Sequence, residues 1–344
     1  MSKPFGTGRL VLGACLLFFF SLLLTTALLP MAIGPNQSPS IEAEQLISRY
    51  APILHFDINE TLMPSDVEHY VSNCRLMRWE NGGGVEAERN VTVLAISALG
   101  RNATSYYLDN ALGSLNDGAI ERWYQSQEDR ISHTVYCRFA SSGGQHLIQY
   151  WMFYGFNNGT FNRHEGDWEL FQIILDAHLH PYEAMFSQHQ SGSRVSWDAI
   201  QKSAGGGPEV YVTRGSHGMS CLPGAIDASG SPTVLHPGDY QLVQLTNATT
   251  DGPIQPWLAF AGRWGEWGGS LGELLGTRGP QGPMFRLNGS MWAGVQWGVA
   301  LPLLGSEGEV SISASSVPPI VETVPQARAI PSDRLKGNSG GAGP

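Results

Sequence analysis

The residues with the clearest capacity for chemistry lie in segment 164–169, which reads HEGDWE. Because successive side chains of a strand point to opposite faces, a strand from Asp167 onward places Asp167 and Glu169 on one face, roughly 6–7 Å apart. His164 lies just upstream, and Gly166 allows the chain to bend between them. One imidazole and two carboxylates suit a divalent cation or acid–base chemistry. A structural network of hydrogen bonds around the same groups is the alternative.

A second candidate lies in segment 214–218, RGSHG, which follows a predicted strand. The flanking glycines would allow His217 to lie on a sharp turn next to a site, so we count His217 and Arg214 as candidate ligand-binding residues. The alternative is a turn histidine that bonds only to its own backbone. The sequence has no H-E-x-x-H motif, so that zinc hydrolase signature gives no support to an enzyme.

Strand-forming patterns dominate the chain that must position these residues. Besides the strand from Asp167, predicted strands cover residues 53–57, 91–97, 131–140, 145–154, 182–189, 209–213 and 240–245. A hairpin joins 131–140 to 145–154, a helix begins at Ser40, another is expected near 120–127, and residues 190–208 are expected to form a loop. The Trp-rich segment 257–269 is expected to pack over one end of the sheets. We predict a mainly β fold, a single large antiparallel β-sandwich over residues 40–314 with a short N-terminal helix.

The first 34 residues contain an uncharged run, residues 10–33, preceded by Lys3 and Arg9. This run exceeds the usual core of a signal peptide and could span a bilayer, so we predict an uncleaved signal anchor, with a cleaved signal peptide as the alternative. Residues 35–39 are expected to form a linker and residues 315–344 a disordered tail. The predicted location is a membrane of the secretory or endomembrane system, with the C-terminal domain lumenal or extracellular; the alternative is a secreted protein.

Half of the asparagines in the chain begin an N-x-S/T sequon, whereas chance predicts roughly two such sites. This excess indicates a glycosylated domain in the secretory pathway. The predicted glycosylation sites are Asn59, Asn90, Asn102, Asn158, Asn247 and Asn288. Asn36 also begins a sequon, but it lies close to the predicted membrane segment.

The cysteines bear on disulfide formation, and the net charge bears on nucleic-acid binding. Cys15 lies in the apolar N-terminal run, which leaves Cys74, Cys137 and Cys221 in the body of the chain. One disulfide and one free thiol is the simplest expectation in an oxidising compartment, and the sequence does not decide which pair is joined. The formal net charge of −10 and the lack of a Lys/Arg run in the body argue against nucleic acid as a partner.

Several segments together resemble the vacuolar protein sorting-associated protein 62 family. They are residues 50–54 (YAPIL), the HEGDWE segment, residues 209–217 (EVYVTRGSH), and the pair 262–265 (GRWG) and 279–283 (GPQGP). The resemblance extends over most of residues 50–300 and rests on the order and combination of these segments. It implies a link to vacuolar sorting and no particular biochemical activity.

The HEGDWE segment by itself is similar to the GHRHDWE heptapeptide of the necrosis- and ethylene-inducing cytolysins. In those proteins an Asp, a His, an Asp and a Glu bind a divalent cation near a sphingolipid-headgroup site on a β-sandwich. The resemblance implies that His164, Asp167 and Glu169 are metal ligands, with the place of the upstream Asp near Asn157 or Asn158; we take Asn157 as the fourth candidate ligand. This chain departs from the pattern at Gly166, where the heptapeptide has its second His, and at Asn157, which carries no charge. Cytolytic activity is therefore not implied.

Three functions remain open on these observations. The first is a binding protein that uses a divalent cation, calcium or magnesium in view of the oxygen-rich ligands, to engage a polar lipid headgroup or a glycan. The second is a metal-dependent hydrolase of a lipid or glycan, in which the metal would activate water, or Glu169 would act as general base with His217 as acid. The third is a trafficking or structural protein without a small ligand. We favour the first.

Overall fold

The computed structural model describes residues 41–301, apart from positions 114, 116–117, 143–144, 160–161, 190, 246–254, 268–276 and 295–296. The predicted signal anchor, the linker and the C-terminal tail lie outside the described residues, as do Asn36 and Asn247. None of the described helices has the length and hydropathy needed to cross a bilayer. The membrane segment at residues 10–33 therefore stays a prediction.

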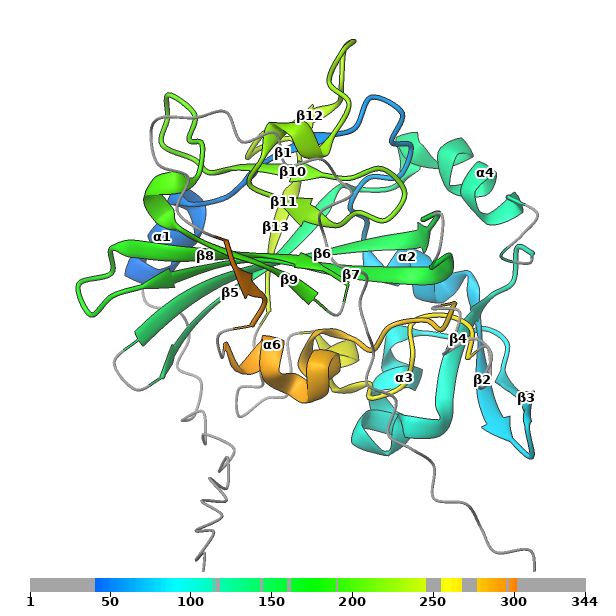
Figure 1. The fold of residues 1–344 in the computed structure, drawn as a ribbon. Helices are drawn as coiled ribbons and strands as arrows, with labels where there is room; N and C mark the ends of the chain where they lie inside the picture. Colours follow the sequence, from blue (N-terminus) through cyan, green and yellow to red (C-terminus); the bar gives the residue numbers. More distant parts are fainter. Residues whose placement is uncertain are drawn as a thin grey trace, which may run out of the picture.

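The described strands form three sheets (Figure 1). The largest has seven strands in the order β13 (Gln241–Gln244), β5 (Thr134–Ser142), β6 (Gln145–Asn157), β7 (His164–Leu175), β8 (Pro181–Gln188), β9 (Ser191–Ser196) and β14 (Val299–Ala300). The second has the order β11 (Met219–Ser220), β10 (Glu209–Val212), β1 (Ile53–Phe56) and β12 (Val234–Leu235). The third has the order β3 (Gly83–Glu88), β2 (Cys74–Glu80) and β4 (Tyr106–Asn110). The mainly β fold is confirmed.

The sequence had led us to expect purely antiparallel sheets, but the structure also contains parallel strand pairs. The strands from β5 to β9 pair antiparallel, but β13 and β14 join the two edges of this sheet in parallel. β1 and β10 also pair in parallel. Parallel neighbours need a long connection between them, and each of these pairs joins segments far apart in the sequence. Such pairings cannot be deduced from local strand patterns.

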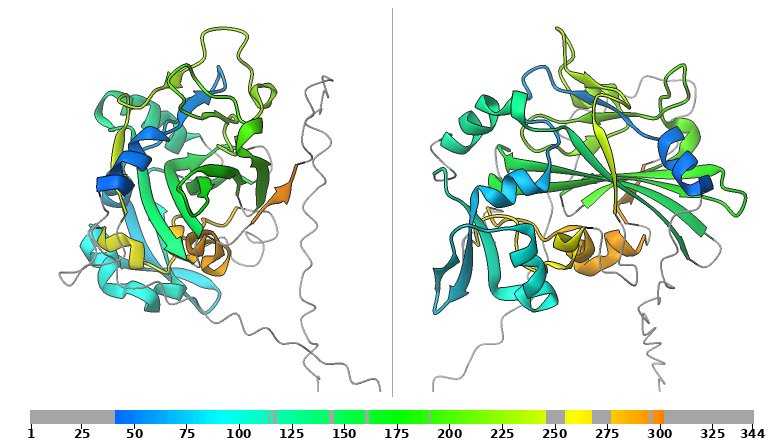
Figure 2. Two further views of the ribbon diagram at one scale, coloured as in Figure 1. Left: turned by 90° about the vertical axis from the view of Figure 1, so that its left-hand side faces the viewer. Right: turned by 180° about the vertical axis from the view of Figure 1, so that it is seen from behind.

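The seven-stranded sheet has a packed core on each face. The four-stranded sheet lies over one face, and helices α3 (Val93–Leu99) and α6 (Ser290–Ala293), with the three-stranded sheet, lie toward the other (Figures 1 and 2). Along β7, Trp168 and Leu170 belong to the core between the large sheet and these helices, whereas Phe171 and Ile173 belong to the core between the large sheet and the four-stranded sheet. The predicted alternation from Asp167 onward is therefore confirmed.

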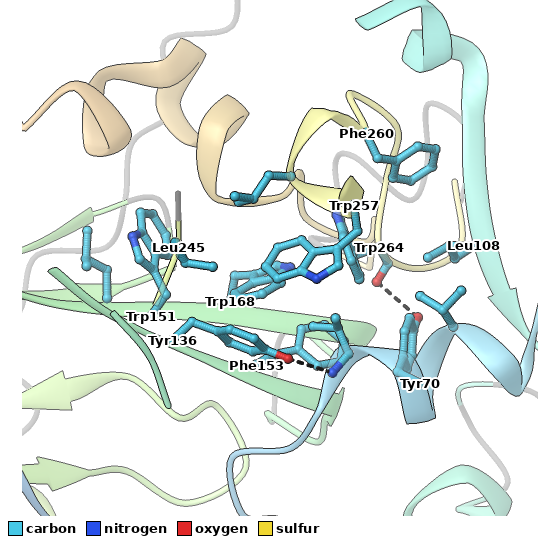
Figure 3. Packing of buried hydrophobic residues seen from close by; sticks show 14 of the residues in the cluster. Tyr70, Leu108, Tyr136, Trp151, Phe153, Trp168, Leu245, Trp257, Phe260 and Trp264 are labelled. Carbon is cyan, nitrogen blue, oxygen red and sulfur yellow. Dashed lines mark hydrogen bonds between the residues drawn. The ribbon is translucent and has the colours of Figure 1, made fainter. Parts of the chain in front are cut away.

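Trp168 lies within an aromatic cluster that packs against β7 on the side of the helices (Figure 3). Its ring centroid is 4.9 Å from that of Phe153 and 5.4 Å from those of Trp257 and Trp264. Full burial of one such ring contributes about 1.5–3 kcal/mol to the free energy of folding. The buried Trp257 and Trp264 confirm the packing predicted for segment 257–269 over its described residues, 257–267.

The remaining described helices are short. They are α1 (Ile41–Arg49), α2 (Val67–Ser72) and α4 (Ala119–Ser126), with 3₁₀ helices at Gly100–Ser105, Glu128–Arg130, Trp197–Ala199, Pro223–Ala225, Pro256–Ala259 and Pro283–Gly289. The helix predicted after Ser40 and the one near 120–127 are confirmed as α1 and α4. The strand predicted at 91–97 is wrong, because Thr92 caps α3 by accepting a hydrogen bond from the backbone N–H of Ala95. The loop predicted at 190–208 contains strand β9.

The predicted disulfide is also wrong, because all three body cysteines are free and buried. Cys74 belongs to the core beneath the helices, on the opposite face of the large sheet from Cys137 and Cys221. Cys137 lies in β5, and Cys221 follows β11, which packs over β7 and β8. The fold thus places the three thiols on elements that are not neighbours, and the pairing expected from their number does not occur.

Candidate metal centre

Gly166 inverts the alternation of β7 at the candidate site. Its φ of +55° is a left-handed conformation inside a strand that otherwise keeps its register with β6. Strict alternation would point His164 and Asp167, three positions apart, to opposite faces. Instead these two residues offer ligand atoms that lie within 4.8 Å of each other. The bend predicted at Gly166 is confirmed, and it is what brings the imidazole and the carboxylate to one face.

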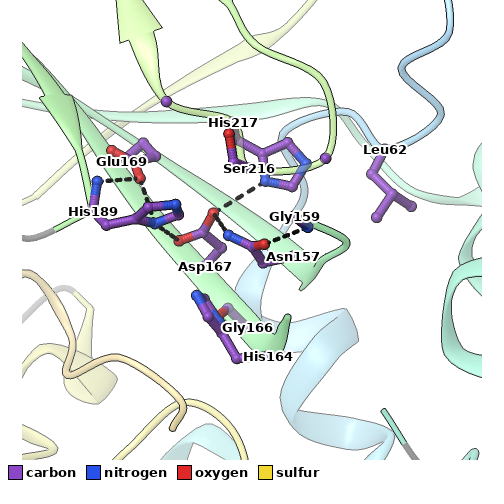
Figure 4. Close-up of polar contacts among 12 residues, drawn as sticks. Leu62, Asn157, Gly159, His164, Gly166, Asp167, Glu169, His189, Ser216 and His217 are labelled. Carbon is purple, nitrogen blue, oxygen red and sulfur yellow. Dashed lines mark hydrogen bonds and ion pairs between the residues drawn. The ribbon is translucent and has the colours of Figure 1, made fainter. Parts of the chain in front are cut away.

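Asp167 is the centre of the polar network (Figure 4). Its side chain is fully buried, and Oδ2 accepts hydrogen bonds from Asn157 Nδ2 at 3.2 Å and from His217 Nδ1 at 3.1 Å. Oδ1 accepts no hydrogen bond from the described residues and lies 3.7 Å from His189 Nδ1. Burial alone would raise the pKa of Asp167, but its interactions with the imidazolium groups of His189 and His217 hold this pKa well below its usual value. Asp167 is therefore a carboxylate.

Glu169 supports the turn that carries His189. This turn joins β8 to β9, and His189 has a left-handed φ of +58°. Glu169 Oε1 accepts the backbone N–H of His189 at 2.9 Å and lies 3.2 Å from its Nδ1, while Oε2 accepts the hydroxyl of Ser187. Burial would lower the pKa of His189, but the hydrogen bonds and negative charges of Asp167 and Glu169 raise it to about 10. Without a metal, His189 is the cation that neutralises these two carboxylates.

His217 supports Asp167 from the opposite side. Its ring stacks on Tyr154 with centroids 3.8 Å apart and planes inclined by 3°, and its Nε2 lies 3.8 Å from Glu60 Oε1. Glu60 also accepts the backbone N–H of Gly215 in the same turn. Burial would lower the pKa of His217, but Glu60 and Asp167 raise it to about 9. Burial would raise the pKa of Glu60, but His217 and the backbone donors lower it to about 2.

His164 has the arrangement of a neutral, metal-binding imidazole. It is 5% exposed, and its Nδ1–H donates to the carbonyl of Gly166 at 2.8 Å. A metal-binding histidine usually donates one ring N–H to a carbonyl in this way, which leaves the other nitrogen, Nε2, as the ligand atom. Burial outweighs the opposing charge of Asp167 and lowers the pKa of His164 to about 4. The ring is therefore uncharged at neutral pH, which is the form that binds metals.

Three of these residues form a donor set that fits a divalent cation. Ligand atoms of His164, Asp167 and His189 all lie within 4.8 Å of one another. The set contains an oxygen without a hydrogen-bond donor, Asp167 Oδ1, and a neutral imidazole. When no cation is bound, the proton on His189 offsets negative charge of the neighbouring carboxylates. Binding of a cation would release that proton. Two nitrogens and one oxygen suit zinc or manganese better than calcium, which prefers oxygen ligands alone.

The structure distributes the predicted site residues over different roles. It brings His164 and Asp167 together, and it places His217 against Asp167 as a hydrogen-bond donor. Glu169 bonds to Ser187 and His189 and is not part of the three-donor set. Asn157 uses its Nδ2 on Asp167 and its Oδ1 on the backbone N–H of Gly159, so it orients the carboxylate. Arg214 is exposed and makes no side-chain hydrogen bond or ion pair among the described residues.

Two members of the network escaped the sequence reasoning, His189 and Glu60. His189 closes a predicted strand, 182–189, and Glu60 lies in a loop between β1 and α2. The signal for His189 is its position in a tight hairpin turn, with β9 beginning at Ser191. Glu60 has no such signal, because its contact with His217 spans more than 150 positions of the chain.

The exposure of the predicted sequons gives a direct test of glycosylation. Asn59, Asn90, Asn102 and Asn288 are exposed, whereas Asn158 is half-buried and its amide donates to Glu121 Oε2 at 2.7 Å. We expect Asn→Gln at each of the four exposed positions to remove one glycan, and Asn158→Gln to remove none. Gel mobility before and after endoglycosidase treatment measures this. A loss of one glycan in the Asn158 variant would contradict the expectation.

A family model defines the relationship of this chain to known proteins. The model of vacuolar protein sorting-associated protein 62 matches residues 32–238, which include the whole network around Asp167. The chain belongs to this family. The membership expected from segments 50–54, 164–169 and 209–217 is thus confirmed, and it links the chain to vacuolar sorting and the endomembrane system.

The family assignment agrees with a curated relative from Saccharomyces cerevisiae, the putative vacuolar protein sorting-associated protein TDA6. The two are 24% identical over 329 residues, which cover 73% of this chain and 67% of that protein. Similar solved structures include NLPPya in complex with glucosamine, with 14% identity, a TM-score of 0.35, and 65% of this chain and 80% of that chain covered. The non-toxic HaNLP3 protein is 12% identical with a TM-score of 0.34, over 74% of this chain and 91% of that chain.

Proposed function

We propose that this member of the family is a glycosylated β-sandwich protein that binds a divalent cation through His164, Asp167 and His189. The observation that carries the proposal is the convergence of ligand atoms from these three residues within 4.8 Å of one another, at a buried Asp167 whose Oδ1 accepts no hydrogen bond from the described residues. Zinc or manganese fits two imidazoles and one carboxylate, which replaces our earlier preference for calcium or magnesium. Glu169, Asn157 and His217 would orient the ligands, as outer residues commonly do at metal centres.

The bound cation would engage an oxygen-rich ligand. Three protein donors leave at least one open coordination position on such an ion. The side chain of His189 is 22% exposed, whereas those of Asp167 and Glu169 are fully buried, so the His189 side of the centre faces solvent. Hydroxyl groups of a glycan or of a glycosylated lipid headgroup would fit this position. The resemblance of the HEGDWE segment to the cytolysin heptapeptide supports the same ligand class.

Metal content is the experiment that tests the cation site. We expect the full chain, purified from a secretory host, to hold close to one zinc or manganese ion, and His164→Ala and His189→Ala to lose most of it because each removes one ligand. Elemental analysis after dialysis measures this. His180→Ala is the matched control, because His180 is exposed on a turn. Metal retained in both site variants, or none in the wild type after dialysis against each ion, would refute the site.

Binding to vesicles tests the ligand. Phosphatidylcholine vesicles with and without a glycosylated sphingolipid should differ in their retention of the protein, and chelation by EDTA should remove the difference. Equal retention on both vesicle types by a metal-loaded protein would refute the lipid-headgroup ligand while leaving the cation site intact.

A further inference from the structure

A second group of acidic side chains lies away from the centre at Asp167. Asp109 at the end of β4, Glu165 in β7 and Glu266, two residues after Trp264, offer oxygen atoms that all lie within 4.8 Å of one another. Asp109 is 8% exposed and Glu165 is fully buried. Glu165 pairs across the sheet with Phe156, whose side chain belongs to the core beneath the helices. The left-handed Gly166 therefore directs Glu165 and Asp167 to opposite faces of one strand.

The side chain of Glu165 is incompletely bonded. Its Oε2 accepts the backbone N–H of Asn110 at 3.0 Å, while Oε1 is buried and has no hydrogen bond from the described residues. An unpaired carboxylate oxygen in the interior costs substantial free energy unless a positive ligand meets it. This oxygen belongs to a fully buried side chain that converges with two other carboxylates. The arrangement points to a cation.

The neighbouring basic side chain does not balance the charge of the group. Arg75 Nη2 lies 2.7 Å from Asp109 Oδ2, and Arg75 Nη1 lies 4.0 Å from Glu86. One guanidinium is thus shared between Asp109 and a carboxylate outside the group. Among the described residues, Arg75 forms an ion pair with only one of the three clustered carboxyl groups, and a divalent cation would supply further positive charge.

Three glycines hold the carboxylates at close range. A Cβ on Gly166 would lie 1.9 Å from the carbonyl oxygen of Trp264, and one on Gly265 would lie 2.2 Å from that of Glu165. A Cβ on Gly279 would lie 2.4 Å from Gly265 Cα. The backbone N–H of Gly279 also donates to the carbonyl of Glu266 at 2.9 Å.

These contacts assign a role to the glycine-rich segments 262–265 and 279–283. They press the backbone around Trp264 against β7, where Tyr70 donates a hydrogen bond to the Trp264 carbonyl (Figure 3). Glu266 is thereby held next to Glu165 by backbone contacts that a side chain at any of the three glycines would prevent.

We propose that Asp109, Glu165 and Glu266 form a second cation site that binds calcium and joins the three-stranded sheet and the Trp264 segment to β7. A set of carboxylate oxygens without nitrogen or sulfur is the ligand type that calcium prefers. This site differs in chemistry from the one at Asp167, which contains two imidazoles. It does not depend on the cation or the ligand proposed there.

Thermal unfolding in calcium tests the second site. The full chain carrying His189→Ala, so that the first centre is disabled, is treated with EDTA, dialysed, and unfolded with and without millimolar calcium chloride. We expect calcium to raise the Tm by a few degrees, because a ligand of the native state stabilises it by mass action. Glu165→Gln in the same background should abolish the increase. Glu88→Gln, an exposed acid on β3, should leave it unchanged.

Each other outcome overturns the proposal. If calcium has no effect on the parent chain, or if its effect persists in Glu165→Gln, calcium does not bind this group. If Glu165→Gln raises the Tm without calcium and calcium does nothing, protons neutralise the carboxylates. Glu266→Gln, at a partly exposed position, serves as the second variant where Glu165→Gln fails to fold. The zinc or manganese content of the wild-type protein tests the first centre independently of these calcium measurements.

Discussion

Asp167→Ala is expected to lower the free energy of unfolding by about 3–5 kcal/mol, because it leaves buried charges without their partner. His217 is fully buried and donates to Asp167 at 3.1 Å, and His189 lies 3.7 Å from the same carboxylate. The amide of Asn157 also loses its acceptor. Urea denaturation of the metal-free protein in EDTA measures the change, so that loss of a cation does not contribute to it.

A matched variant separates this effect from the general cost of removing a carboxylate. Asp198 is exposed on a 3₁₀ helix, so Asp198→Ala should change the free energy of unfolding by less than about 0.5 kcal/mol. A loss below about 1 kcal/mol in Asp167→Ala would mean that His189 and His217 give up their protons at little cost. In that case the network would not be held together by charge.

The part of the site that could be predicted from sequence is the part that strand geometry determines. Alternation from Asp167 to Leu175 places Trp168 in one core and Phe171 in the other, because both faces of the sheet are buried. The hairpin of β5 and β6 was equally predictable, since Gly143 and Gly144 separate two runs of strand-forming residues. Such features depend on neighbours within a few positions.

The rest of the site depends on contacts between distant segments. Glu60 meets His217 because β1 and β10 pair in parallel, so the loops that follow them lie together. His189 reaches Asp167 because β8 is the neighbour of β7 in the sheet. Local periodicity contains no information on such pairings, which explains why His189 was absent from the ligand set expected from the sequence.

The error in the predicted strand at 91–97 has a local cause. The residues of α3, VLAISAL, have the composition of a strand, and the Thr92 cap at its start decides in favour of a helix. The family resemblance included segments 262–265 and 279–283, which are in contact in the structure although residues 266–278 separate them in the sequence.

Gly166→Ala is expected to have a comparably large effect, a loss of about 2–5 kcal/mol in the free energy of unfolding. The left-handed backbone, φ +55°, costs a residue with a Cβ about 1–2 kcal/mol, and overpacking typically costs a further 1–3 kcal/mol. The added Cβ would lie 1.9 Å from the carbonyl oxygen of Trp264, which belongs to a segment fixed by backbone hydrogen bonds. Urea denaturation measures the loss.

Gly82→Ala is the control that separates the two costs. Gly82 has a φ of +82°, and a Cβ there meets nothing within 4 Å, so only the backbone cost of about 1–2 kcal/mol applies. Equal losses in the two variants would show that the Trp264 segment moves away from β7 freely. We expect a larger loss in the free energy of unfolding for Gly166→Ala than for Gly82→Ala. We also expect Gly166→Ala to reduce the binding of both cations, because the inversion at Gly166 directs His164 and Asp167 to one face and Glu165 to the other.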